Sequence, residues 1–110
     1  MVRRISFMKY KKEKLVLAGI VIIFLLLHST PHLALRTHVF ISGYPGAALT
    51  SGIIEDDYHN KADSKKFARL NGKAYTLTDP PIEKATEGLL RNYLVRKFGF
   101  LYFAEYYGET

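Results

Sequence analysis

The chain has 110 residues, which leaves room for one small domain, and it has no cysteine, so disulfides and thiol nucleophiles are excluded. Its formal net charge of +6 arises mainly before Leu15, where six basic residues stand against one acidic residue. The rest of the chain is nearly neutral, and it therefore lacks the concentrated basic surface that binds phosphate backbones. We expect no nucleic-acid partner.

The basic start is followed by an uninterrupted apolar stretch of thirteen residues, Leu15 to Leu27. If this stretch continues as a helix to Leu35, it is about 31 Å long, enough to cross the hydrocarbon core of a bilayer. Positive charge favours the cytoplasmic side of a membrane. The pattern therefore predicts a cytoplasmic tail over residues 1–14, a transmembrane signal-anchor over 15–35 and a small extracytoplasmic domain over 36–110.

A cleaved signal peptide is the alternative interpretation of this segment. It would release a secreted small binding module and would be recognised by the mass of the mature N-terminus. Small residues are needed at the first and third positions before the cut. A cut after Ala34 would place His32 at the third position, and a cut after Pro31 would place proline next to the cleaved bond. An uncleaved anchor is therefore favoured.

The segment after the anchor, residues 36–66, gives mixed signals. The sequence THVFIS suits either a strand or a continuation of the membrane helix beyond a kink at Pro31. Residues 55–66 are polar and rich in turn formers, which is typical of an exposed loop. Three consecutive carboxylates there, Glu55, Asp56 and Asp57, point in different directions in such a loop, so we expect them to be solvated, as we do His59.

The next two predicted elements have clearer start and stop signals in the sequence. Asn71-Gly72 is a dipeptide typical of tight β-hairpins, and it lies between apolar residues on both sides. Capping residues at Thr78 and Asp79, prolines directly after them and an apolar stripe of period 3.6 predict an amphipathic helix over Pro80–Phe98. Gly99 would end this helix in the left-handed conformation.

The chain ends in a run of aromatic residues, Phe100 to Tyr107, which predicts a strand in the centre of the sheet. One face of this strand carries Tyr102 and Tyr106, which we expect to be buried. The other face forms the candidate interaction surface, which consists of Phe103, Glu105 and Tyr107. Large rings suit contacts with a membrane or a protein because they bury much area at little entropic cost.

Three histidines give the remaining alternative, a metal-dependent enzyme at the membrane surface. His28 and His32 would share a helical face, and His38 follows them. No orienting carboxylate lies nearby in the sequence, and no motif for nucleophilic or phosphate chemistry is present. We therefore expect no metal, no cofactor and no enzymatic activity.

Together these elements predict an α+β protein with one transmembrane helix and a domain built from a β-hairpin, one amphipathic helix and a terminal aromatic strand. The expected function is non-enzymatic: an accessory or regulatory partner of another cell-envelope protein, anchored in the lipid bilayer. The expected location is the cell membrane, with the domain outside.

Overall fold

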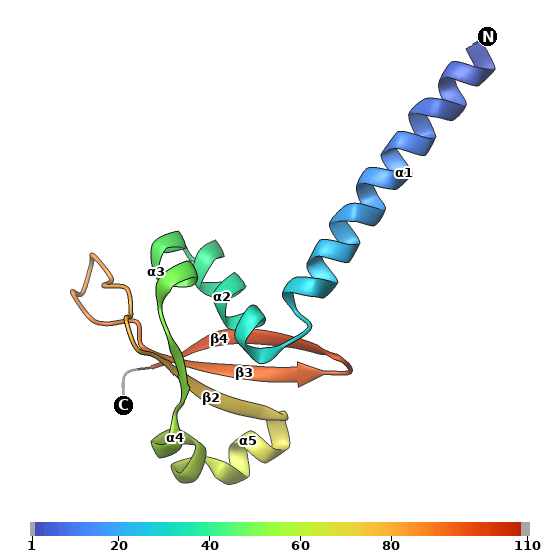
Figure 1. Cartoon of the computed structure of the whole chain (residues 1–110). Helices are drawn as coiled ribbons and strands as arrows, with labels where there is room; N and C mark the ends of the chain where they lie inside the picture. Colours follow the sequence, from blue (N-terminus) through green and yellow to red (C-terminus); the bar gives the residue numbers. More distant parts are fainter. Residues whose placement is uncertain (1, 109–110) are drawn as a thin grey trace.

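The computed structural model describes residues 2–108, and side chains are described from Lys11 onward. The α+β class is confirmed, since a four-stranded antiparallel sheet is combined with several helices (Figure 1). The elements in chain order are α1 (Val2–Leu27), α2 (Pro31–Ile41), α3 (Pro45–Thr50), β1 (Ile53–Glu55), α4 (Asp57–Ala62), α5 (Ser64–Leu70), β2 (Gly72–Leu77), β3 (Asn92–Phe98) and β4 (Leu101–Gly108).

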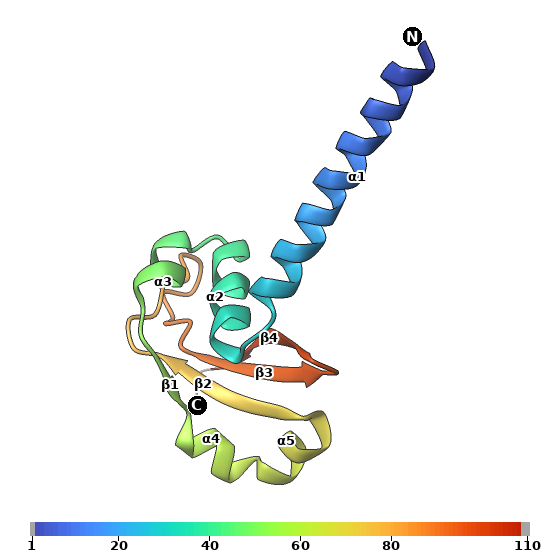
Figure 2. The same ribbon diagram turned by 45° about the vertical axis from the view of Figure 1, so that its right-hand side comes forward.

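The sheet has the order β1-β2-β3-β4 and separates two layers of helices. Helices α2 and α3 cover one face, and α4 and α5 cover the other (Figures 1 and 2). The larger core lies under α2 and α3, and Leu35 and Val39 are its largest fully buried helical side chains. The smaller core, on the opposite face, contains Phe67, Ala74 and Leu94.

The predicted helix Pro80–Phe98 is wrong, because its second half is the inner strand β3. Tyr93, Leu94 and Val95 are consecutive and buried, which requires cover on both faces of a strand. Tyr93 and Val95 enter the larger core, whereas Leu94 enters the smaller one. The helical period in this segment was therefore coincidental. Burial on both faces outweighed it.

The first half of that segment is a long loop between β2 and β3. Glu87 adopts a left-handed conformation with φ of 57°, which interrupts any helix there. Ile82 and Leu89 form an isolated antiparallel bridge, and the amide of Glu83 donates to the carbonyl oxygen of Gly88. The prolines before this bridge thus begin a folded loop instead of a first helical turn.

The hairpin predicted at Asn71-Gly72 is also wrong. Asn71 does have positive φ, 50°, but it caps the C-terminus of α5, and β2 begins directly after it. The tight hairpin joins β3 to β4, where Phe98 pairs with Leu101. Gly99 has φ of 61° in this turn, so the left-handed conformation expected there occurs in a strand connection and not at a helix end.

The single helix expected from Leu15 to Leu35 is broken. Helix α1 ends at Leu27, Thr30 caps α2 by accepting from the amide of Leu33, and the two helices are bent by 113°. Leu35 lies in the core of the domain. Within the described residues no helix alone has the length and apolar composition to cross a membrane, whereas the bent pair Lys11–Leu27 and Pro31–Ile41 together does.

The segment of mixed signals is largely helical. THVFIS lies mainly in α2, which is amphipathic and packs on the sheet. The polar stretch expected to be a loop forms α4 and α5 because Asp56 caps α4, its carboxylate accepting from the amide of His59 at 3.1 Å. His59 is buried, contrary to the expectation that it would be solvated.

Candidate interaction surface

The aromatic strand β4 exists as expected, but it lies at the edge of the sheet and not at its centre. Tyr102 and Ala104 pack on the larger core, under α2. The ring of Tyr106 meets that of Tyr93 edge-on, with centroids 5.6 Å apart, although Tyr106 remains 42% exposed. Burial raises the pKa of Tyr93 to about 12. This face of β4 is thus covered by α2, which occupies the place expected for the predicted helix.

Phe103, from the candidate interaction surface, faces the end of α1. Its ring centroid lies 4.9 Å from that of His28 and 6.2 Å from that of Phe24. The ring of Phe98 is 5.8 Å from that of Phe103, so four rings from two parts of the chain form one cluster. Phe103 therefore joins α1 to the β3–β4 hairpin and is half-buried by that contact.

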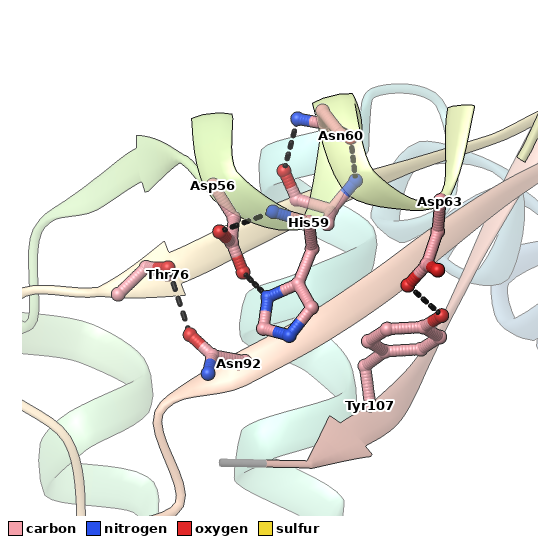
Figure 3. A network of polar contacts seen from close by, with 8 residues as sticks. Asp56, His59, Asn60, Asp63, Thr76, Asn92 and Tyr107 are labelled. Carbon is pink, nitrogen blue, oxygen red and sulfur yellow. Dashed lines mark hydrogen bonds and ion pairs between the residues drawn. The ribbon is translucent and has the colours of Figure 1, made fainter. Parts of the chain in front are cut away.

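Tyr107, at the other end of the same strand face, is held by α5 and the residue before it. Its hydroxyl donates to Oδ2 of Asp63 at 2.6 Å (Figure 3). The same hydroxyl accepts from Nζ of Lys66 at 3.3 Å. Its ring stands edge-on to Phe67, 5.1 Å away, and to His59, 5.3 Å away. The hydrogen bond to Asp63 raises the pKa of Tyr107. Tyr107 thus ties the edge strand to the α4–α5 layer.

A buried polar network lies next to Tyr107, and sequence reasoning missed it. The carboxylate of Asp56 binds both the amide and Nδ1 of His59 (Figure 3). Asn60 continues the network: its side-chain amide donates to the carbonyl oxygen of Ala74 at 3.0 Å, and its carbonyl accepts from the amide of Ala74 at 2.7 Å. Asn60 therefore acts as a strand partner for β2 beyond the short β1. An Asp three residues before a His, at a helix start, was the available signal.

Glu105, the third member of the candidate surface, is exposed. Its negative charge interacts with His38 of α2. Burial lowers the pKa of His38, and the charge of Glu105 partly opposes that shift by raising the pKa. The three residues of the candidate interaction surface therefore have different surroundings: Phe103 contacts the end of α1, and Tyr107 contacts the α4–α5 layer. Phe103 and Tyr107 make internal contacts, and Glu105 faces solvent.

One protein-family model covers almost the whole of this fold. The model of the YjcN family matches residues 8–108. The chain belongs to the YjcN family. The match includes the apolar part of α1 together with the complete sheet, so the helix and the domain form one family unit. No curated protein and no solved structure matches the chain.

The three histidines of the metal alternative lie in separate environments in this YjcN-family chain. His28 stacks near Phe103, His32 stands edge-on to Tyr75 and His38 stands edge-on to Tyr93. Among residues 2–108 as described, no group of three or more His, Asp or Glu side chains is arranged to hold a metal ion. Each histidine instead packs on an aromatic ring of the sheet.

A shallow hollow of about 340 Å³ opens between the start of α2 and the sheet, and Tyr75 and Tyr102 line it. Its two lysines are engaged by other groups. Lys73 pairs with Glu55, which raises the pKa of Lys73, and Nζ of Lys97 lies 5.7 Å from the ring centroid of Tyr102. The hollow therefore offers aromatic surface more than free positive charge.

Among the described side chains of this YjcN-family chain, those of the apolar stretch of α1 form a long uncovered surface. Ten large apolar side chains between Leu15 and Leu27 are exposed by 37–65%. Figures 1 and 2 show α1 projecting from the domain, and its contacts with the domain lie at its C-terminal end. A helix that is apolar on all sides and uncovered needs an apolar environment.

Proposed function

We propose that this protein is anchored in a membrane by α1 and presents its domain outside the cytoplasm as a non-enzymatic partner of another cell-envelope protein. The observation that carries the proposal is the exposure of α1, whose ten large apolar residues between Leu15 and Leu27 are 37–65% exposed. In water this surface would be strongly unfavourable, at about 25 cal/mol for each Å² of apolar area. In a bilayer it is covered.

The length of α1 is compatible with an anchor that uses its flanks. The stretch Leu15–Leu27 measures about 20 Å as a helix, shorter than the hydrocarbon core of about 30 Å. Lysine side chains bury their stems and extend their charges toward headgroups, and bilayers thin around short spans. Lys11, Lys12 and Lys14 precede the stretch on the same helix, which is 26 residues long. They supply the missing length on the cytoplasmic side.

The charge distribution supports the orientation. Six basic residues precede the apolar stretch, and Arg36 is the one basic residue between that stretch and Lys61. Cytoplasmic flanks are enriched in Lys and Arg. The family match from residue 8 to residue 108 supports treating helix and domain as one unit, as an uncleaved anchor requires.

The interaction role is supported by exposed rings on the β3–β4 hairpin. Phe98 and Phe100, at its tip, are 51% and 74% exposed, and Tyr106 and Glu105 are exposed further along β4. Exposed aromatic residues beside a charged group are typical of protein interfaces. Within the predicted surface, Glu105 is the member that is available to a partner, whereas Phe103 and Tyr107 support the strand beneath it.

The absence of cysteine makes the topology directly testable. Single variants Ser6→Cys, in the basic segment, and Ser64→Cys, exposed in α5, are expressed in intact cells and treated with a membrane-impermeant maleimide. We expect labelling of Ser64→Cys without permeabilisation and labelling of Ser6→Cys after it. Labelling of both variants, or of neither, in intact cells would contradict the anchor.

The mass of the protein recovered from the membrane fraction tests the secreted alternative. A full-length mass supports the anchor, and a chain beginning near residue 35 would establish cleavage. For the partner, a photo-crosslinking residue at position 100 should capture one envelope protein reproducibly. The matched control is position 58, an exposed tyrosine on α4, where we expect no capture.

A further inference from the structure

A second exposed apolar surface lies on the domain beside the end of α1. We call it the α2–α3 surface, and it consists of Leu33, Phe40, Ile41 and Leu49, which are 40%, 52%, 77% and 73% exposed. It surrounds a hollow of about 380 Å³ to which Leu27, the last residue of α1, also contributes. The apolar surface of α1 thus continues onto the domain without interruption.

The bend between the helices directs this surface toward the membrane. Because the bend of 113° exceeds a right angle, α2 runs back toward the side from which α1 comes. With α1 along the membrane normal, the C-terminal end of α2 is the end nearer the bilayer. Figures 1 and 2 agree: α3 and the end of α2 lie on the side of the domain toward α1, and α4 and α5 lie at the opposite pole.

The charges follow the same division of the molecule. No Asp or Glu occurs between Glu13 and Glu55, a range that includes the apolar part of α1 and all of α2 and α3. The opposite pole, residues 57–70, carries charges of both signs: Asp57 and Asp63 stand beside Lys61, Lys65, Lys66 and Arg69. A surface without carboxylates approaches anionic headgroups without repulsion or the cost of desolvating a negative charge.

The hollow also contains a cation in a suitable place. Arg36 lines it, and its guanidinium donates to the carbonyl oxygen of Ala48 at 2.8 Å, which leaves further N–H donors on the same planar group. Arginine beside apolar and aromatic side chains is a usual composition of a membrane-surface helix.

We propose that the α2–α3 surface docks on the outer leaflet of the membrane that holds α1. This inference rests on the proposed anchoring by α1. Lipid is the occupant because Leu27 lines the same hollow and is the last residue of the inserted stretch. The hollow therefore lies at the depth where α1 leaves the hydrocarbon core of the membrane.

Docking fixes the orientation of the domain. Helix α2 lies close to the membrane plane. It is bent by 113° from α1, and a bend of 90° would lay it flat in the plane, so it is inclined to the plane by 113° − 90° = 23°. The α4–α5 layer then points away from the membrane, and the exposed edge of β4 stands at the side, where another membrane protein can reach it. The domain is thereby held as a rigid platform instead of a freely rotating head.

The test uses the full chain in vesicles of phosphatidylethanolamine and phosphatidylglycerol. Single cysteines are introduced at Ile41, Leu49, Ile20 and Tyr58 and labelled with an environment-sensitive fluorophore. All four native side chains are exposed, so labelling does not disturb the core. Quenching is measured with lipids that carry a nitroxide near the headgroup or deep in the acyl chain.

We expect headgroup-level quenching at Ile41→Cys and Leu49→Cys several-fold stronger than at Tyr58→Cys, and deep quenching at Ile20→Cys. Quenching at Ile20→Cys with none at positions 41 and 49 would overturn the docking and leave the anchor intact. Absence of quenching at Ile20→Cys would overturn the anchor itself. Unquenched labels at positions 41 and 49 that crosslink to a second copy would show that protein covers the surface, which also overturns the inference.

Discussion

The backbone amide of Tyr102 donates a hydrogen bond of 2.8 Å to the carbonyl oxygen of His28, the residue that follows α1. This bond connects the edge strand β4 to the end of the apolar helix. It satisfies a carbonyl that has no partner within α1 and an amide that faces outward from the sheet. The aromatic end of the chain therefore has a first structural purpose, which is to hold α1 against the domain.

Phe103 should contribute to this joint more than to the stability of the domain, because its ring contacts His28 and Phe24. We expect Phe103→Ala to leave the sheet folded and to loosen the angle between α1 and the domain. Spin labels at Ile20→Cys and Ser64→Cys report this angle as a distance distribution, which should broaden. Phe100→Ala, at an exposed turn position, is the matched control. An unchanged distribution in Phe103→Ala would show that the ring of Phe103 does not hold the joint.

Tyr107 should matter to stability through its hydroxyl. Tyr107→Phe removes the hydrogen bond to Asp63 and the one from Lys66 while keeping the ring on Phe67. We expect a loss of about 1–3 kcal/mol in the free energy of unfolding, since both partners are charged side chains. Urea denaturation of the detergent-solubilised protein measures it.

The control for Tyr107→Phe is Tyr58→Phe. Tyr58 also stands edge-on to His59, but it is 70% exposed. Its hydroxyl is surrounded by water, so its removal should change the free energy of unfolding little. Equal effects of the two substitutions would show that the bond to Asp63 contributes no net stability.

The sequence predicted the terminal strand correctly because consecutive aromatic residues suit an extended chain. It did not predict β3, since the run from Tyr93 to Val95 lies within a segment with helical punctuation at both ends. Whether such a segment forms a helix or a strand depends on whether other elements pack on both of its faces. Here α2 packs on one face and α5 on the other, and both are distant in the chain. Tertiary burial decided against local propensity.

The candidate interaction surface was predicted only in part, again because contacts between residues distant in the sequence decide it. Alternation along β4 placed Phe103, Glu105 and Tyr107 on one face, but their partners are distant in the sequence: α1 for Phe103 and the α4–α5 layer for Tyr107. The helices α4 and α5 were missed because their segment is short and polar. They depend on the cap at Asp56 and on the burial of Phe67.

Asn71 should be replaceable by glycine but not by alanine, because it caps α5 with φ of 50° and ψ of 44°. A residue with a Cβ pays roughly 1–2 kcal/mol in this conformation, which asparagine tolerates better than alanine. Its carbonyl oxygen also accepts from the amide of Lys97 at 2.9 Å, so the turn cannot simply move. We expect Asn71→Ala to lower the thermal midpoint and Asn71→Gly to leave it nearly unchanged. A similar fall in both variants would mean that the side chain of Asn71, and not its backbone, is required.

The pair of His38 and Glu105 gives a pH-dependent prediction. Burial lowers the pKa of His38 below the ordinary value of 6.5, and the charge of Glu105 opposes this shift. A histidine with a depressed pKa in the fold contributes stability that is present above the unfolded pKa and lost as pH falls through the folded pKa. The protein should therefore become less stable below about pH 6.5, the ordinary histidine pKa.

Glu105→Gln tests the origin of this dependence, because it removes the charge that favours protonated His38 and should lower the pKa of His38 further. Since the folded and unfolded pKa values then differ more, the loss of stability on acidification should be larger than in the native protein. An NMR titration of the His38 ring measures the pKa, and denaturation at several pH values measures the stability. Glu83→Gln, in the loop between β2 and β3, is the control with the same change in net charge. A pKa that moves equally in both variants would show that His38 responds to net charge, and a pKa that rises in Glu105→Gln would contradict the electrostatic role of Glu105.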